Sequence, residues 1–293
     1  MFAMKLNKSE IEVLELLCSN EYPMRELAEK WGRKQPFVSR VVKQLDEKAM
    51  IQVKRNGVQK IVSLFSFGSA QSFKRLYETR KGLSEWLSGA CLDVLIVLST
   101  QDRDLKELER ESDYSRPMIY KALKKLYAAG AIAKERGVIR VSDEEVKQFA
   151  IAFAQDVTAR KMIGSASGQT LGKAWGKRLL IVNRYGQLSK EFELTGLNRL
   201  ARDYGLEGIL TDRQAYYQYL GKKKKELGIE DYFIHALALT KNFQGEDKPL
   251  LAVFLKGHKM NPLKLRELAK EFGVEAELRE LQSAVGYYDR LGG

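Results

Sequence analysis

Basic side chains recur at matching places in two stretches of this 293-residue chain. Residues 33–60 hold eight Lys or Arg against two acids, and residues 114–140 hold seven against one. The two surpluses together equal the formal net charge of +12, so the other residues sum to zero. Arg can donate two hydrogen bonds to a guanine edge, and Lys can pair with phosphate. We therefore expect both stretches to bind one polyanionic partner.

An internal repeat relates the two basic stretches. Pro36 and Pro117 are 81 positions apart, and the same offset relates apolar and charged residues around them. The matching pairs are Val13 with Val94, Leu14 with Leu95, Leu17 with Leu98, Glu26 with Glu107, Leu27 with Leu108, Lys43 with Lys124, Leu45 with Leu126 and Ile51 with Ile132. A repeat of this length indicates one folding unit used twice.

Three helices and a hairpin are predicted in the first repeat. Apolar residues recur with a helical period after Ser9, which we expect to cap the first helix. A second helix is expected over 24–31, and a third begins at Pro36, where proline loses no hydrogen bond. Apolar residues then alternate around Asn56-Gly57, which predicts a hairpin with a type I′ turn.

The second repeat predicts the same order of elements. Helices are expected over 92–98, 105–111 and 117–128, and Gly130 should end the last of them. A shorter hairpin over 132–141 should turn at Arg136-Gly137. Each third helix should bury one apolar face. These faces comprise Phe37, Val38, Val41, Val42 and Leu45 in the first repeat, and Met118, Ile119, Ala122, Leu123 and Leu126 in the second.

The opposite faces of the third helices, with the hairpins, supply the candidate binding residues. In the first repeat these are Arg33, Lys34, Gln35, Ser39, Arg40, Lys43, Lys54, Arg55 and Lys60. In the second they are Tyr114, Ser115, Arg116, Tyr120, Lys121, Lys124, Lys125, Lys134, Arg136 and Arg140. A solvated lysine-rich surface is the alternative. Recurrence in both repeats favours a binding surface.

Residues 35–45, Gln-Pro-Phe-Val-Ser-Arg-Val-Val-Lys-Gln-Leu, resemble a recognition helix of MarR-like and ArsR-like winged helix-turn-helix transcription regulators. The resemblance covers roughly the first half of the chain, and the duplicated unit is similar to archaeal regulators. It implies that the third helix enters the major groove of double-stranded DNA while the hairpin, or wing, touches backbone or minor groove. By resemblance, the residues near base edges are Ser39, Arg40, Lys43, Tyr120, Lys121 and Lys124.

The two repeats differ at this surface. Ser39-Arg40 corresponds to Tyr120-Lys121, and the first hairpin has an Asn-Gly tip that the second lacks. We expect the first repeat to read sequence and the second mainly to position the chain on phosphate. One chain should then recognise an asymmetric site, and two paired chains a longer palindromic one.

The expected fold is mainly α with small β-hairpin wings in two winged-helix domains, followed by a mixed α/β domain. The expected boundaries are winged-helix domains at 1–67 and 88–142, a connecting helix at 68–87, a linker or dimerisation helix at 143–163, a flexible linker at 164–176 and the mixed domain at 177–293. Ser142 should cap the helix at 143–163 in a capping box with Glu145. Its apolar stripe could serve either a homodimer or intramolecular packing.

In the mixed domain, strands are expected over 178–183 and 208–211, and helices over 197–204, 212–227 and 262–272. The apolar runs 233–239 and 250–255 could each form a helix or a strand. A solvated helix face is the first interpretation of the lysine run at 222–225, and a phosphate contact the second. Residues 192–200 faintly resemble a motif of abortive-infection antitoxins. We expect this domain to sense an effector, bind a protein partner or mediate assembly.

Enzymatic chemistry has little support in the sequence. The glycine-rich run 164–174 lacks the spacing and the Ser or Thr of a phosphate-binding P-loop, so no ATP site or other cofactor is expected. Cys18 and Cys91 should be core thiols, and His235 a core histidine. No Cys or His pair has metal-ligand spacing, so no metal is expected. No stretch is apolar enough to span a membrane, and we expect a cytoplasmic location.

Three functions remain open at this stage. The first is sequence-specific DNA binding by a transcription regulator. The second is DNA docking by a replication factor or a nucleic-acid-processing enzyme. The third is a winged-helix module that binds proteins, including an antitoxin-like autoregulator. Salt dependence separates DNA binding from protein binding, because phosphate contacts release counterions.

Overall fold

The computed structural model describes residues 4–165, 169–184, 188–206, 213–221, 226–243 and 248–290. The chain is mainly helical and contains several small antiparallel sheets, including hairpins. It divides into two compact units, the first formed by residues 1–161 with 220–223 and the second by residues 162–219 with 224–293. No helix in the described ranges has the length and apolar character needed to cross a membrane.

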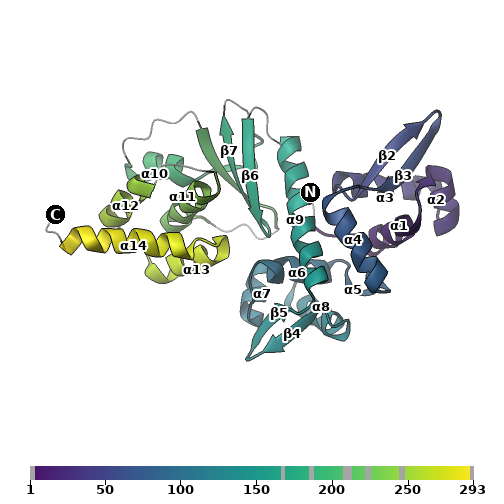
Figure 1. Cartoon of the computed structure of the whole chain (residues 1–293), viewed down its shortest axis with the longest axis horizontal. Coiled ribbons are helices and arrows are strands. Elements are labelled where there is room, and N and C mark those ends of the chain that lie inside the picture. The colour runs from purple at the N-terminus through teal and green to yellow at the C-terminus, as the bar shows by residue number, and fades with distance from the viewer. Residues whose placement is uncertain are drawn as a thin grey trace. The chain divides into compact units, whose positions relative to one another are not determined.

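The first repeat has the predicted order of three helices and a hairpin (Figure 1). Its elements are α1 (Lys8–Ser19), β1 (Tyr22–Pro23), α2 (Met24–Trp31), α3 (Gln35–Glu47), β2 (Ile51–Asn56) and β3 (Gln59–Leu64). The three strands form one antiparallel sheet in the order β1-β3-β2. Residues Leu14, Leu27, Leu45 and Ile51, which all belong to the repeat pattern, are fully buried.

The second repeat folds in the same order. Its elements are α6 (Ala90–Thr100), α7 (Leu105–Glu111), α8 (Arg116–Ala128), β4 (Ile132–Glu135) and β5 (Val138–Val141). Arg103, which lies 81 positions after Tyr22, makes a single antiparallel bridge to Ile139 of β5. Because Tyr22 pairs with β3 in the first repeat, this bridge is the counterpart of β1. Gly130 lies beyond α8 at φ +66°, as predicted.

The starts of the helices are set by side-chain caps and prolines. Asn7, not Ser9, caps α1, since its side-chain oxygen accepts the Glu10 N–H at 2.9 Å. Serine was the wrong choice because Asn7 and Glu10 have the three-residue spacing of a capping box. Pro36 and Pro117 lie in the first turns of α3 and α8, where the backbone N–H groups have no helical partner.

The hairpin turns differ from the prediction in one case. Asn56 pairs with Gln59, so the first turn is Gly57-Val58, and only Gly57 has positive φ, at +59°. A type I′ turn at Asn56-Gly57 is therefore wrong; extending the strand pairing to Asn56 shifts the turn by one residue. The second hairpin turns at Arg136-Gly137 as predicted, with φ of +49° and +87°.

The connection between the repeats is two helices, not one. Helix α4 (Gly68–Thr79) ends before Arg80, and the short α5 (Leu83–Trp86) follows Gly82, which has φ +65°. Positive φ at Gly82 breaks the predicted continuous helix over 68–87. Gly68 also has positive φ, +60°, and a Cβ there would clash with the Asp156 carboxylate.

Helix α9 (Glu144–Ser165) packs inside the first unit through residues 144–161. Its apolar stripe is buried, and the rings of Phe149 and Phe73 on α4 are 5.7 Å apart. Intramolecular packing is therefore the observed role of this stripe. The predicted cap at Ser142 is wrong: Asp143 accepts the Val146 N–H at 3.1 Å, and Ser142 Oγ donates to a carbonyl instead.

The second unit combines one antiparallel sheet with a helical layer. The strands β6 (Gln169–Trp175), β7 (Arg178–Arg184), β8 (Glu193–Leu194) and β9 (Arg213–Tyr219) have the order β6-β7-β9-β8. The helices are α10 (Gly196–Tyr204), α11 (Ile229–Phe243), α12 (Lys248–Gly257), α13 (Pro262–Phe272) and α14 (Glu275–Arg290). The strand over 178–183, the helices over 197–204 and 262–272, and the mixed character are confirmed.

Several predictions for this unit are corrected. Residues 169–175 form a strand, not a linker, and Gly172 permits close packing because a Cβ there would lie 2.6 Å from Met162 Sδ. Residues 213–219 form a strand where a helix was predicted; their aromatic residues suit a pleated surface. The ambiguous runs 233–239 and 250–255 are helical. The predicted strand 208–211 and the lysine run 222–225 lie outside the described residues.

The cysteines and His235 belong to the core, as predicted. Both thiols are free and buried, and burial raises the pKa of Cys18 to about 12 and that of Cys91 to about 11. His235 is 1% exposed and shares a 2.7 Å hydrogen bond with Thr195 Oγ1. Its ring stacks on Tyr217. These three side chains are packed away from solvent.

Candidate nucleic-acid interface

Helix α3 presents a polar face to solvent. Val38, Val41, Val42 and Leu45 lie buried on its other side. Every candidate from the first repeat is exposed, on α3, on the turn before it or on the hairpin: Arg33, Lys34, Gln35, Ser39, Arg40, Lys43, Lys54, Arg55 and Lys60. The first turn of α3 contains no acid, so the positive end of the helix dipole is not neutralised there.

Helix α8 presents the corresponding face of the second repeat. Nine of its ten candidates are exposed: Ser115, Arg116, Tyr120, Lys121, Lys124, Lys125, Lys134, Arg136 and Arg140. Tyr114 is half-buried, and burial together with the neighbouring Asp93 carboxylate raises the pKa of its hydroxyl. Tyr114 is thus less accessible to a partner than its counterpart Arg33.

The cations of the two repeats differ in their partners. Within the described residues, Arg40, Lys43, Lys54, Arg55 and Lys60 of the first repeat make no ion pair. In the second repeat, three cations are held by the protein itself. Arg116 pairs with Glu109 at 2.9 Å, Arg140 pairs with Glu135 at 3.2 Å, and Lys125 Nζ donates to the Glu85 carbonyl oxygen at 2.8 Å.

The hairpins show the same contrast. Arg55 and Lys60 are directly opposite each other across β2 and β3, where like charges destabilise a sheet. In the second hairpin the residue opposite Arg140 is Ala133, which is uncharged. Glu135 lies diagonally across from Arg140 and forms an ion pair with it. An anion bound at the first hairpin would relieve the repulsion between Arg55 and Lys60.

A polar contact joins the first two helices of each repeat, and the sequence interpretation missed it. Trp31 Nε1 donates to Glu12 Oε2 at 3.2 Å in the first repeat. The residues 81 positions later are Ser112 and Asp93, whose side chains are hydrogen bonded at 2.7 Å and buried. Comparing non-identical residues at the repeat offset would have found this contact. It holds α7, and hence the start of α8, against α6.

Two apolar residues predicted to be inward are exposed instead. Phe37 is 38% exposed and Met118 is 43% exposed, and they are equivalent in the repeat. Both occupy the edge of the apolar face, so a helical pattern cannot separate them from the buried positions. The Phe37 ring stacks on Trp31 with a centroid distance of 5.4 Å, and the Arg33 guanidinium lies 5.9 Å from the Trp31 ring.

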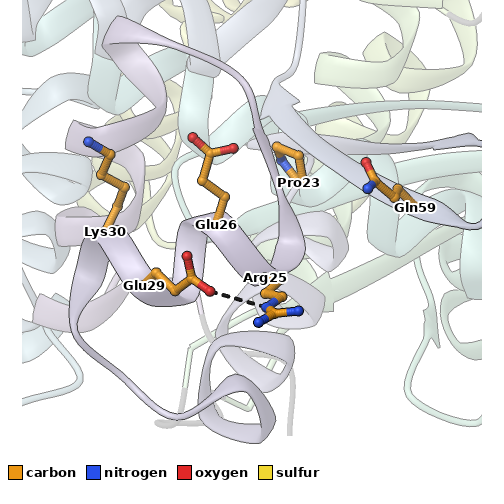
Figure 2. Close-up of a pocket in the computed structure, with 6 residues that line it drawn as sticks. All are labelled: Pro23, Arg25, Glu26, Glu29, Lys30 and Gln59. Carbon is orange, nitrogen blue, oxygen red and sulfur yellow. Dashed lines mark hydrogen bonds and ion pairs between the residues drawn. The ribbon is translucent and has the colours of Figure 1, made fainter.

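Two depressions beside this surface are balanced in charge. One, of about 680 Å³, is lined by Pro23, Arg25, Glu26, Glu29, Lys30 and Gln59, and Figure 2 shows Arg25 paired with Glu29 among these residues. The other, of about 850 Å³, contains three acids and three bases: Glu12, Glu15, Glu78, Lys30, Arg33 and Lys81. Burial raises the pKa of Glu15. Neither depression concentrates positive charge as the α3 face does.

In the part of the chain that the structure describes, no group of three or more His, Cys, Asp or Glu residues is placed to hold a metal ion. The arrangement at α3 and α8 is instead one of exposed donors. Arg, Lys, Ser, Gln and Tyr side chains can donate hydrogen bonds to phosphates and base edges. The surface is thus suited to binding an anionic polymer.

No protein-family model matches the chain, and no curated protein or solved structure is significantly similar to it. Function is therefore inferred from the residues and geometry of the chain itself.

Proposed function

We propose that each repeat is a winged helix-turn-helix domain and that the chain binds double-stranded DNA through both. In this proposal α3 and α8 are recognition helices and the two hairpins are wings. The order of three helices and a hairpin supports the assignment, as does the third strand contributed by β1 or by the Arg103 bridge. The function that follows is sequence-specific transcription regulation.

The observation that carries the proposal is the exposed basic face found at equivalent positions of α3 and α8. Arg40 and Lys43 correspond to Lys121 and Lys124, and all four are exposed and make no ion pair within the described residues. A face that only solvates itself ordinarily mixes acids with bases. The spacing of three residues places both cations of each helix on one side, so both can enter one groove.

The two recognition surfaces act differently in this mechanism. Arg40 donates to the O6 and N7 atoms of a guanine in the major groove, while Lys43 and the hairpin cations neutralise phosphates. Lys121 and Lys124 add phosphate contacts from the second domain. The first domain therefore supplies most of the specificity, and the second contributes affinity that depends less on sequence.

The second unit extends the proposal to regulation or assembly. Its core of packed helices on an antiparallel sheet is separate from the core of the repeats. A separate core allows this unit to bind an effector or a partner chain without disturbing the recognition helices. Its role would be tested by comparing the DNA affinity of the full chain with that of a chain ending after α9.

Selection of bound fragments from random duplex DNA tests the proposal. The expected result is an enriched motif with one well-defined half and one weakly defined half, matching the two unequal repeats. Arg40→Ala should weaken the base preference in the well-defined half of the motif. Lys270→Ala, which removes an exposed cation from α13 of the second unit, is the charge-matched control and should leave the motif unchanged. Recovery of DNA in which no sequence motif is enriched would overturn the proposal.

A further inference from the structure

Phe37 and Met118 are exposed apolar side chains at the same place in both repeats. Each follows a proline in the first turn of the third helix, and they are 38% and 43% exposed. Each also lies three residues before a cation of the binding face, Arg40 or Lys121. A single exposed apolar residue needs no explanation, but equivalent ones beside equivalent cations indicate a shared role.

We infer that Phe37 and Met118 contact thymine methyl groups in the major groove, and that the thymine contacted by Phe37 lies next to the base pair contacted by Arg40. This inference rests on the proposed DNA binding and adds the base that is read. The thymine C5-methyl is the one apolar group that a base pair presents in the major groove, and apolar side chains recognise it.

Helix geometry places the two contacts on neighbouring base pairs. Residues three apart on a helix share a face and are separated by about 4.5 Å along the axis. Base pairs are stacked about 3.4 Å apart. For a recognition helix that runs along the groove, Phe37 and Arg40 reach adjacent steps, and the expected motif contains a thymine beside the guanine read by Arg40.

Phe37 is held for this role more firmly than Met118. Its ring stacks on Trp31, and Trp31 is fixed in turn by its hydrogen bond to Glu12. Met118 is an unbranched, flexible side chain, and the residue at the position of Trp31 is Ser112, which offers no ring to stack on. The thymine dependence should therefore be strong in the half-site of the first repeat and weak in that of the second.

Replacing thymine by uracil in the selected duplex tests the inference with the unaltered protein. Uracil lacks only the methyl group, so loss of its burial should weaken binding about fourfold at the position that Phe37 contacts. Phe37→Ala should bind both duplexes equally, and Phe37→Leu should keep the preference for thymine. Phe67→Ala is the matched control, because Phe67 is 71% exposed but precedes α4, and it should discriminate as the unaltered chain does.

The outcomes separate this inference from the proposed function. Tight binding that is unchanged by uracil at every position would overturn the inference and leave DNA binding standing. Equal thymine preference in the unaltered chain and in Phe37→Ala would also overturn it. Absence of binding to any duplex would overturn both.

Discussion

The two repeats share an order of elements but differ in how their cations are held. In the first, Arg40, Lys43 and the hairpin cations have no ion-pair partner within the described part of the chain. In the second, Glu109 and Glu135 each pair with an arginine, Arg116 and Arg140. A free cation loses only hydration and mobility when it meets phosphate, whereas a paired one must first give up its partner.

This difference is the structural basis for proposing two different roles for the repeats. Under the proposed DNA binding, the unpaired donors of the first repeat are available for base edges and phosphates. In the second repeat, the ion pairs of Arg116 and Arg140 would reduce the attraction for DNA. The repulsion between Arg55 and Lys60 is accordingly tolerated only in the first hairpin.

Replacing the matched cations Arg40 and Lys121 should give the largest difference between the repeats. Arg40→Ala should cost about 1–3 kcal/mol of binding free energy and relax preference at one base pair, because a bidentate contact is lost. Lys121→Ala should weaken binding to selected and random duplexes alike. Fluorescence anisotropy with both duplexes measures this. Equal, sequence-independent losses would contradict the division of roles.

The polar contact between the first two helices should matter more in the second repeat. Asp93→Ala leaves the buried Ser112 hydroxyl without its acceptor and should lower the free energy of unfolding by about 1–3 kcal/mol. Glu12→Ala affects a half-buried contact to Trp31 and should cost about 0.5–1.5 kcal/mol. Urea titrations compare the two. A larger loss from Glu12→Ala would contradict the greater importance of this contact in the second repeat.

Removing the acids of the second repeat should make it resemble the first. The double variant Glu109→Gln with Glu135→Gln frees Arg116 and Arg140, so DNA affinity should rise severalfold. The log affinity against log salt slope should steepen by about 0.9 for each phosphate gained. Glu29→Gln is the control, since it frees Arg25 on α2, which is not a candidate. An equal gain from the control would assign the effect to net charge alone.

Relief of the like-charge pair in the first hairpin should give the smallest effect. Arg55→Gln should raise the free energy of unfolding by about 0.2–1 kcal/mol while lowering DNA affinity. Arg140→Gln should lower stability slightly, because Glu135 loses its partner. Thermal unfolding and anisotropy on the same preparations measure both quantities. A loss of stability in Arg55→Gln would mean that Lys60 does not repel it.

The sequence predicted the order of the elements in both repeats, but it failed at the Ser9 and Ser142 caps, at the first hairpin turn and where packing decides. Pro36 and Pro117 correctly predicted the starts of two helices, and Gly130 the end of one. The 81-residue offset correctly predicted exposed polar faces on both third helices. Gly172 was misread because its sequence neighbours resemble a linker, while its role is a close approach to Met162. The exposure of Phe37 depends on the Trp31 ring beneath it, which periodicity does not encode. The pairing of Arg116 and Arg140 likewise requires three-dimensional contacts.

The salt dependence of binding to a selected duplex tests the central claim most directly. If both repeats contact phosphates, at least six contacts should form, and the slope of log affinity against log salt should be about −5 or steeper. Charge-reversing substitutions of Lys43 and Lys124 should each reduce that slope. A flat slope, with affinity unchanged between low and high salt, would contradict DNA binding by the paired basic faces.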